Sequence, residues 1–301
     1  MNRPLVSVII PTYKRPDTLD RAINSVLSQT YPNIEIIVVD DNNPGSEGRA
    51  LTESKMSHYR GNSKVLYVKH EKNKNGSAAR NTGARVSRGD FVAFLDDDDQ
   101  FLPKKIESQV SKLLSLSGDW GFCYSKYYTQ KNNGKLVPVQ EHREGDLYIL
   151  ALKQELCVNA GSNLLIRKSA FNSINGFDET FKRNQDHEFL VRLLKKYKIA
   201  YVDTPGLIYS VGTTNVSVNY IETISYYNKV FKNELEQMSK LDQMDYKNNI
   251  DYLIILDLIS PNKKYFEAIR RLFGKDVNTI NIVSRLLKNT MLAFKRKIVS
   301  L

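Results

Sequence analysis

The sequence is poor in the residues and runs that mark several classes of protein. It has two cysteines, Cys123 and Cys157, among 301 residues. Two cysteines allow one disulfide but no disulfide framework, so we expect a reducing cytoplasm. No stretch approaches the ~18 apolar residues of a membrane-spanning helix, and the opening MNRPLVSVIIPTYKR lacks the cleavage pattern of a signal peptide. A hydrophobic fraction of 41% and a charged fraction of 26% are typical of a soluble globular protein.

Glycine-rich phosphate-binding motifs are also missing. Neither G-x-G-x-x-G nor G-x-x-x-x-G-K-[ST] follows any expected strand. Those motifs bind phosphates through backbone N–H groups at the start of a helix. If this chain binds phosphates, carboxylates that hold a divalent cation across a diphosphate are the remaining route.

Positive charge is unevenly distributed. The net charge is +11, and residues 263–301 hold ten Lys or Arg against two acids, which leaves +8 there. A basic tail implies an anionic partner, either nucleic acid or an anionic membrane surface. A nucleic-acid-binding protein is therefore one alternative. It is disfavoured because no recognisable motif is present and the basic residues cluster in one tail instead of along a groove.

Apolar strand patterns and helical patterns alternate along the chain. We expect strands at 5–10, 34–40, 64–70, 91–96 and 121–129, with helices at 19–29, 76–87 and 103–116 between them. This alternation predicts an α/β fold with a mostly parallel sheet and helices on both faces. Further on, we expect a helix at 184–197 and two strands at 199–203 and 207–211. Beyond about 218 only helical patterns remain, so we expect a catalytic domain at 1–217 and a helical, basic C-terminal extension at 218–301.

Four carboxylates, Asp96 to Asp99, follow the strand expected at 91–96 in the run FLDDDD. Acidic runs are commonly solvated loops. This one ends a buried strand, which is where ligands bind in open α/β sheets. Adjacent carboxylates repel unless a cation joins them, and hard oxygen ligands favour Mg²⁺, Mn²⁺ or Ca²⁺ over zinc. The run therefore predicts a divalent-cation site.

Other polar side chains follow neighbouring strands. Tyr13 can stack on a base, Asp41 can accept a hydrogen bond from a base N–H, and Arg80 can pair with phosphate. Each also has an ordinary explanation: packing for Tyr13, helix capping for Asp41 and a surface position for Arg80. On one predicted sheet edge they together favour a nucleotide-diphosphate site.

Five segments of the sequence are similar to motifs of a known family. VSVIIPTYKR, IEIIVVDDNNPG, NGSAARNTGARVSRGDFVAFLDDDD, NLLIRKSAFNSINGFDE and NQDHEFLVRL occur in this order. From about Leu5 to about Ser217 the chain resembles the family 2 glycosyltransferases of GT-A fold. The resemblance implies an inverting, metal-dependent hexosyltransferase that moves one sugar from a nucleotide-diphosphate donor, expected to be a UDP-hexose. The implied acceptor is a glycan or a polyprenyl-diphosphate-linked glycan of cell-surface polysaccharide synthesis.

The resemblance also assigns roles to residues. The acidic run is similar to the Asp-x-Asp motif of the family, so Asp98 and Asp96 are expected to bind Mn²⁺ or Mg²⁺. Asp96 or Asp97 is expected to hold the ribose and the metal-bound waters, and Asp99 only to shape the loop. The same likeness implies a nucleotide-sugar pocket lined by Pro11, Tyr13, Arg15, Asp41, Arg80, Asp96 and Asp97.

The acceptor side of the site is expected at Asp186. The family has a Glu-Asp pair here, and this chain has Gln185 and Asp186. Asp186 is the expected general base, and its uncharged neighbour favours its ionised form. An acid placed at a helix N-terminus for the macrodipole is the alternative. The Q-x-x-R-W motif of processive synthases is absent after Asp186, and the loop at 209–217 has no metal-binding His.

The last segment predicts an amphipathic helix. Val283, Leu286, Leu287, Met291, Phe294 and Ile298 share one face. Docking on the catalytic domain, burial in a homodimer and contact with an anionic membrane all fit, and we favour the membrane. The expected location is then cytoplasmic and peripheral, at the inner face of the cell membrane. A metal-dependent nucleotidyltransferase is the other enzyme alternative, but PTYKRPD is not the glycine-rich loop it normally has.

Overall fold

The computed structural model describes residues 3–211, 220–259, 264–274 and 277–287. The chain divides into two compact units. The first unit comprises Met1–Ala151 and Leu156–Thr213, and the second comprises Leu152–Glu155 and Thr214–Leu301. The domain boundary predicted near residue 217 falls at 212–219, outside the described residues.

The first unit is built on one sheet of nine strands, in the order β3-β2-β1-β4-β8-β6-β9-β5, with β7 paired to β6. Its parallel half consists of β1 (Val6–Thr12), β2 (Ile34–Asp40), β3 (Val65–Lys69) and β4 (Phe91–Phe94). Every residue of β1, β2 and β4 is buried. Such continuous burial is typical of parallel strands covered on both faces.

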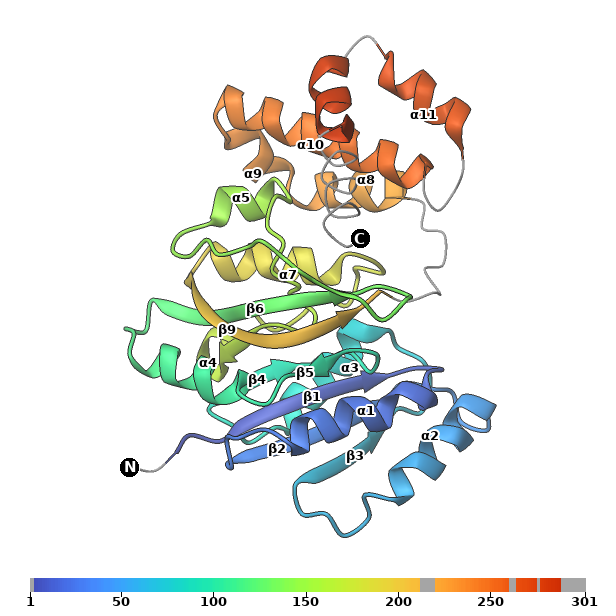
Figure 1. Cartoon of the computed structure of the whole chain (residues 1–301), viewed down its shortest axis with the longest axis vertical. Coiled ribbons are helices and arrows are strands. Elements are labelled where there is room, and N and C mark those ends of the chain that lie inside the picture. The colour runs from blue at the N-terminus through green and yellow to red at the C-terminus, as the bar shows by residue number, and fades with distance from the viewer. Residues whose placement is uncertain (1–2, 212–219, 260–263, 275–276, 288–301) are drawn as a thin grey trace. The chain divides into compact units, whose positions relative to one another are not determined.

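The other half of the sheet is mixed. β8 (Leu165–Arg167) runs antiparallel to β4 and to β6 (Trp120–Gln130), and β6 runs parallel to β9 (Lys198–Ser210). β5 (Gln100–Phe101) and β7 (Leu136–Pro138) add short antiparallel pairs. Helices cover the sheet on both sides (Figure 1). The predicted α/β architecture is confirmed.

β9 differs from the prediction. Two strands were expected at 199–203 and 207–211, separated by Pro205 and Gly206, and the structure has one continuous strand. Pro205 lies opposite Lys126, between two shifts of register. Since proline has no N–H to donate, a bulge is the place where a sheet tolerates it. Gly206 is required because a Cβ there would collide with the side chain of Ser125.

Seven helices complete the described part of this unit: α1 (Pro16–Leu27), α2 (Glu47–Ser57), α3 (Gly76–Val86), α4 (Lys105–Leu114), α5 (Tyr148–Leu152), α6 (Lys168–Ser173) and α7 (Gln185–Leu194), with Leu152 of α5 assigned to the second unit. The small residues of α3 let it approach the sheet closely. A Cβ at Gly83 would collide with Ile9 of β1. This close packing carries Arg80 of α3 to the ends of the strands.

The second unit is helical throughout its described residues. It contains α8 (Tyr220–Val230), α9 (Lys232–Gln237), α10 (Lys240–Ile259) and α11 (Tyr265–Leu272), and residues 279–287 are helical as well. Lys153 Nζ lies 3.0 Å from Asp242 Oδ1, and the Tyr227 hydroxyl donates to Leu152 O at 2.9 Å, so residues 152–155 belong here. Across the described residues, every helix is too short or too polar to cross a bilayer.

Lys105 is a fully buried cation at the start of α4. Its Nζ donates to Gln109 Oε1 at 2.7 Å and to Asn163 O at 2.8 Å, and it lies 4.6 Å from the centre of the Phe101 ring. Burial lowers the pKa of Lys105 from 10.5 to about 7. The folded protein therefore carries a desolvated ammonium group below neutral pH.

This burial predicts a stability that rises with pH. Between about pH 7 and 10.5 the unfolded chain binds a proton at Lys105 that the folded chain has lost, so the free energy of unfolding increases with pH in this window. Lys105→Met should flatten that increase, whereas Lys104→Met, at an exposed position, should keep it. Urea denaturation at pH 7 and pH 9 measures the difference. Equal pH slopes for the wild type and Lys105→Met would contradict the assignment.

Candidate functional site

The acidic run lies in the turn between β4 and β5. Oxygen atoms of Asp96, Asp98 and Asp99 all lie within 4.8 Å of one another. Asp99 N donates to Asp96 O at 3.0 Å and closes the turn, while Asp96 N donates to Ser162 Oγ at 3.0 Å. The backbone therefore folds three of the four carboxylates toward one point.

Asp99 has a larger part than the sequence suggested. It was expected only to shape the loop, but the structure adds it to the cluster. Oδ1 accepts a hydrogen bond from Ser210 N of β9 at 2.9 Å, and the buried Oδ2 has no hydrogen-bond partner among the described residues. The turn that folds Asp99 back toward Asp96 is a local signal that sequence reasoning overlooked.

Asp97 has a different environment from its neighbours. It is fully buried and is not among the clustered carboxylates. Burial raises the pKa of Asp97 to about 7, opposed by Arg15, whose Nη2 lies 2.8 Å from Oδ1. Arg15 also pairs with Asp98. Asp97 thus positions Arg15 at the edge of the cluster.

Arg80 neutralises the other side of the cluster. It extends from α3 and pairs with Asp96, and its guanidinium lies 5.5 Å from the centre of the Phe177 ring. A Cβ at Gly76 would lie 2.9 Å from Arg80 Nη1 and 3.4 Å from Gln185 Oε1. Glycine therefore leaves room where Arg80 meets the first residue of α7.

The cluster fits a hard divalent cation. It offers three carboxylates, one of them with a buried oxygen that lacks a hydrogen-bond partner in the described structure. Burial raises the pKa of Asp98, and burial together with the Asp96 charge raises that of Asp99 well above its ordinary value. A cation would reverse both effects by favouring the ionised forms. Oxygen ligands of this kind suit Mg²⁺ and Mn²⁺.

The residues expected around the base and ribose lie at the ends of β1 and β2. Pro11 is buried within β1, and Tyr13 directly after it is 38% exposed. Asp41 is buried, and its carboxylate accepts hydrogen bonds from Lys74 N, Asn75 N and Asn73 Nδ2 at 2.8–3.0 Å.

Asp41 also contacts a histidine, with His70 Nδ1 at 2.7 Å from Oδ1. Each carboxylate oxygen thus has two partners. The carboxylate holds the loop at 73–75 in place, and a base N–H would compete with these contacts. Tyr13 is therefore the more accessible of the two predicted base contacts.

The charges of Asp186 and of the acidic cluster act on the same tyrosine, Tyr209. Asp186 lies half-buried in the first turn of α7. Burial, followed by the charges of Asp99, Asp96, Asp98 and Asp186, raises the pKa of Tyr209 to about 12. Tyr209 is the penultimate residue of β9, next to Ser210, which bonds to Asp99. Tyr209, which the sequence did not single out, therefore experiences the charge of the predicted base as well as that of the predicted metal ligands.

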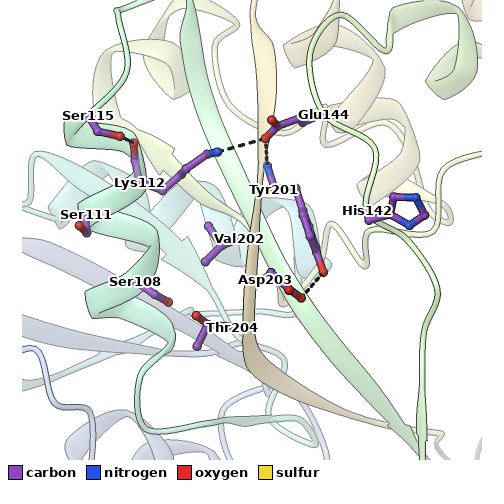
Figure 2. Close-up of a pocket in the computed structure, with 10 residues that line it drawn as sticks. All are labelled: Ser108, Ser111, Lys112, Ser115, His142, Glu144, Tyr201, Val202, Asp203 and Thr204. Atoms are coloured by element: carbon purple, nitrogen blue, oxygen red, sulfur yellow. Dashed lines mark hydrogen bonds and ion pairs between the residues drawn. The ribbon is translucent and has the colours of Figure 1, made fainter.

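A separate groove of about 640 Å³ lies along α4 and the first part of β9 (Figure 2). Ser108 and Ser111 of α4, with Ser115 directly after the helix, line one wall. Glu144 bridges Lys112 Nζ at 3.2 Å and Tyr201 N at 3.0 Å. The groove ends at Thr204, six residues before Ser210, which is roughly 20 Å along a strand. It therefore contains none of the residues of the acidic cluster.

Comparison with known proteins agrees with this geometry. The model of the family "Glycosyl transferase family 2" matches residues 7–174. An uncharacterised glycosyltransferase of Rickettsia bellii is 33% identical over 69% of this chain, which spans 30% of that relative. The Escherichia coli UDP-Glc:alpha-D-GlcNAc-diphosphoundecaprenol beta-1,3-glucosyltransferase WfgD is 30% identical, over 73% of this chain and 82% of its own length.

Solved structures show the same fold. S. aureus TarS 1–349 in complex with UDP-GlcNAc has a TM-score of 0.56 at 17% identity, covering 89% of this chain and 90% of that one. The mannosyltransferase PcManGT of Pyrobaculum calidifontis, in complex with GDP-Man and Mn²⁺, has a TM-score of 0.58 at 15% identity, covering 98% and 81%. The match over residues 7–174 and the relatives at 30% identity or more lead to one conclusion: this chain belongs to glycosyl transferase family 2 and is a glycosyltransferase of GT-A fold.

Proposed function

We propose that the protein transfers one hexose from a UDP-sugar to a glycan carried on a polyprenyl diphosphate, with inversion and without processivity. The observation that carries this proposal is the cluster of Asp96, Asp98 and Asp99 at the end of β4, in a chain of glycosyl transferase family 2. The name of WfgD, with its UDP-Glc donor and diphosphoundecaprenol acceptor, supports the choice of substrates. The protein would act in cell-surface polysaccharide synthesis, peripherally at the cytoplasmic face of the membrane.

The donor end of the reaction needs positive charge at the leaving diphosphate. Asp98, Asp96 and Asp99 would hold Mn²⁺ or Mg²⁺, which neutralises the diphosphate when bound. Arg15 and Arg80 already lie against the cluster and supply guanidinium groups that suit phosphate oxygens. Pro11, Tyr13, Asp41 and Asp97 complete the proposed nucleotide-sugar pocket, with Asp97 acting through Arg15.

The acceptor end needs a proton acceptor. Asp186, in the first turn of α7, would accept this proton, and its neighbour Gln185 carries no charge. Gln185 Nε2 donates to Phe181 O at 3.0 Å, which fixes the neighbour in place. Removal of the acceptor proton on the face opposite the diphosphate gives a single displacement and inversion.

Membership of a glycosyltransferase family favours this reaction over the two alternatives. Nucleotidyl transfer would use the same kind of carboxylate-held cation, and nucleic-acid binding would use the basic charge. The absence of Q-x-x-R-W after Asp186 supports a single transfer for each encounter.

Asp98→Asn should remove most of the activity and weaken the Mn²⁺-dependent binding of UDP, because one of three clustered carboxylates is lost. Isothermal titration with UDP, in Mn²⁺ and in EDTA, measures this directly. Glu71→Gln, at an exposed position away from the cluster, is the matched control and should behave as wild type. Full turnover by Asp98→Asn in EDTA would disprove the metal site.

Asp186→Asn should bind UDP as wild type does but lose activity by on the order of 10²–10⁴-fold, the usual cost of removing a general base. NMR of the product from the wild type reports the anomeric configuration. Normal turnover by the variant would exclude Asp186 as the base. A product that retains the donor's configuration would exclude the single displacement.

Gln185→Glu should shift the acidic limb of the pH–rate profile to higher pH. A carboxylate at this position raises the pKa of Asp186 by repulsion, so the base is protonated earlier as the pH falls. Gln185→Ala is the control for lost contacts without added charge. An identical acidic limb in the glutamate variant and the wild type would contradict the placement of the base.

A further inference from the structure

The helix α11 leaves its apolar residues in solvent. Phe266 and Ile269 of α11 are 80% and 56% exposed, and Phe273, directly after the helix, is 71% exposed. Arg270, also exposed, lies beside Ile269 in the sequence. The positions 266, 269, 270 and 273 follow one another at helical spacing, so they form one stripe. A surface helix of a soluble protein normally turns such a stripe inward.

The contacts of α11 with its own unit show why this stripe faces outward. Ala268 is its buried residue, and Arg271 Nη2 donates to Asp251 Oδ1 of α10 at 2.6 Å. These two positions turn the helix so that its smaller side meets α10, against which it packs (Figure 1). The large apolar side chains are thus left without a partner within the described unit.

The next helical stretch, 279–287, has the same character. Ile282 is fully buried, whereas Ile280 and Leu287 are 83% and 57% exposed. Single exposed apolar residues are ordinary, but a group of this size indicates an interaction surface. Of the amphipathic face predicted for the tail, Val283 and Leu287 are exposed, while Met291, Phe294 and Ile298 lie outside the described residues.

The charge around these apolar residues identifies the partner. Lys264 and Arg270 are exposed, and two acids of the described unit are paired with cations: Glu267 with Lys264 at 3.7 Å, and Asp251 with Arg271 at 2.6 Å. The described part of 264–287 holds four Lys or Arg and one acid, and the whole segment 263–301 has a sequence charge of +8. A two-fold contact with a second copy would set this positive surface against itself. Apolar residues flanked by cations instead suit an anionic bilayer.

We propose that α11 and the stretch at 279–287 form a lipid-docking surface, in which Phe266, Ile269 and Phe273 enter the interface of an anionic membrane and Arg270 pairs with headgroup phosphates. This proposal rests on the proposed function in one respect: a lipid-linked acceptor requires the enzyme to work at a membrane. Binding to lipid itself depends on this surface and not on the donor site.

Flotation of the full-length protein with vesicles tests the proposal. Wild type should float with phosphatidylcholine vesicles that contain phosphatidylglycerol at low salt, and less at high salt because the headgroup attraction is screened. Phe266→Glu combined with Phe273→Glu should weaken binding by more than about tenfold, since two buried aromatic side chains are lost. Leu241→Glu, the same change at a 64% exposed residue of α10, should float as wild type does.

A second pair of variants tests the contribution of positive charge to lipid binding. Arg270→Glu should reduce the salt-sensitive part of the binding, and Lys232→Glu, at a side chain that is 70% exposed in α9, should not. All variants should keep the wild-type melting temperature and its shift with UDP and Mn²⁺, because the altered residues are exposed and outside the donor site.

Three results would overturn the proposal. They are no flotation of the wild type at low salt, equal flotation of the double phenylalanine variant, or light scattering that shows the double variant breaking a dimer while lipid binding is unchanged. If the wild type floats but shows no binding of UDP, the proposed function fails and the lipid surface stands.

Discussion

Repulsion among carboxylates at the end of β4 is the constraint on which the rest of the site depends. Four acids in succession follow a fully buried strand, where low polarity strengthens the interaction between charges. Burial raises the pKa of three of them, so nearby positive charge is needed to favour their ionised forms. Arg15 from the start of α1 and Arg80 from α3 supply it within the protein.

Several features of the fold serve this charge balance. Gly83 lets α3 lie close to β1, and Gly76 leaves room for Arg80 to reach Asp96. Ser210 N of β9 donates a hydrogen bond to Asp99, so a strand from late in the sequence is bonded to the turn. Both arginines belong to elements that are packed on the sheet, which fixes their positions before any substrate arrives. Preorganised charge of this kind is what stabilises a leaving diphosphate.

The sequence predicted those parts of the molecule that local patterns determine. Alternation of strands and helices was sufficient for the parallel half of the sheet, because β1, β2 and β4 are buried along their whole length. The strand β9 was predicted as two, since Pro205 normally ends a strand and only its pairing with a bulge in β6 allows it to continue. That pairing joins residues far apart in the sequence.

The site shows the same division. The acidic run and Asp186 were predicted from their own neighbourhoods, and the charges of both act on Tyr209. The added role of Asp99 and the four contacts that occupy Asp41 depend on partners from other segments. A strand pattern can predict that a carboxylate is buried. It cannot predict the hydrogen-bond partners of that carboxylate, because these come from segments that are distant in the sequence and adjacent only in the folded chain.

The distribution of charge along the chain separates two tasks that would otherwise conflict. A cation site needs excess negative charge, whereas attraction to an anionic surface needs excess positive charge. If both were mixed along one surface, lysines and arginines would compete with the metal for the carboxylates, as Arg15 already does at Asp98. The sequence instead places four successive acids in one turn of the first unit and +8 of its net charge at 263–301, in the second. Each unit can then meet its own electrostatic requirement, and changes in α11 should leave the pKa values of the acidic cluster unaltered.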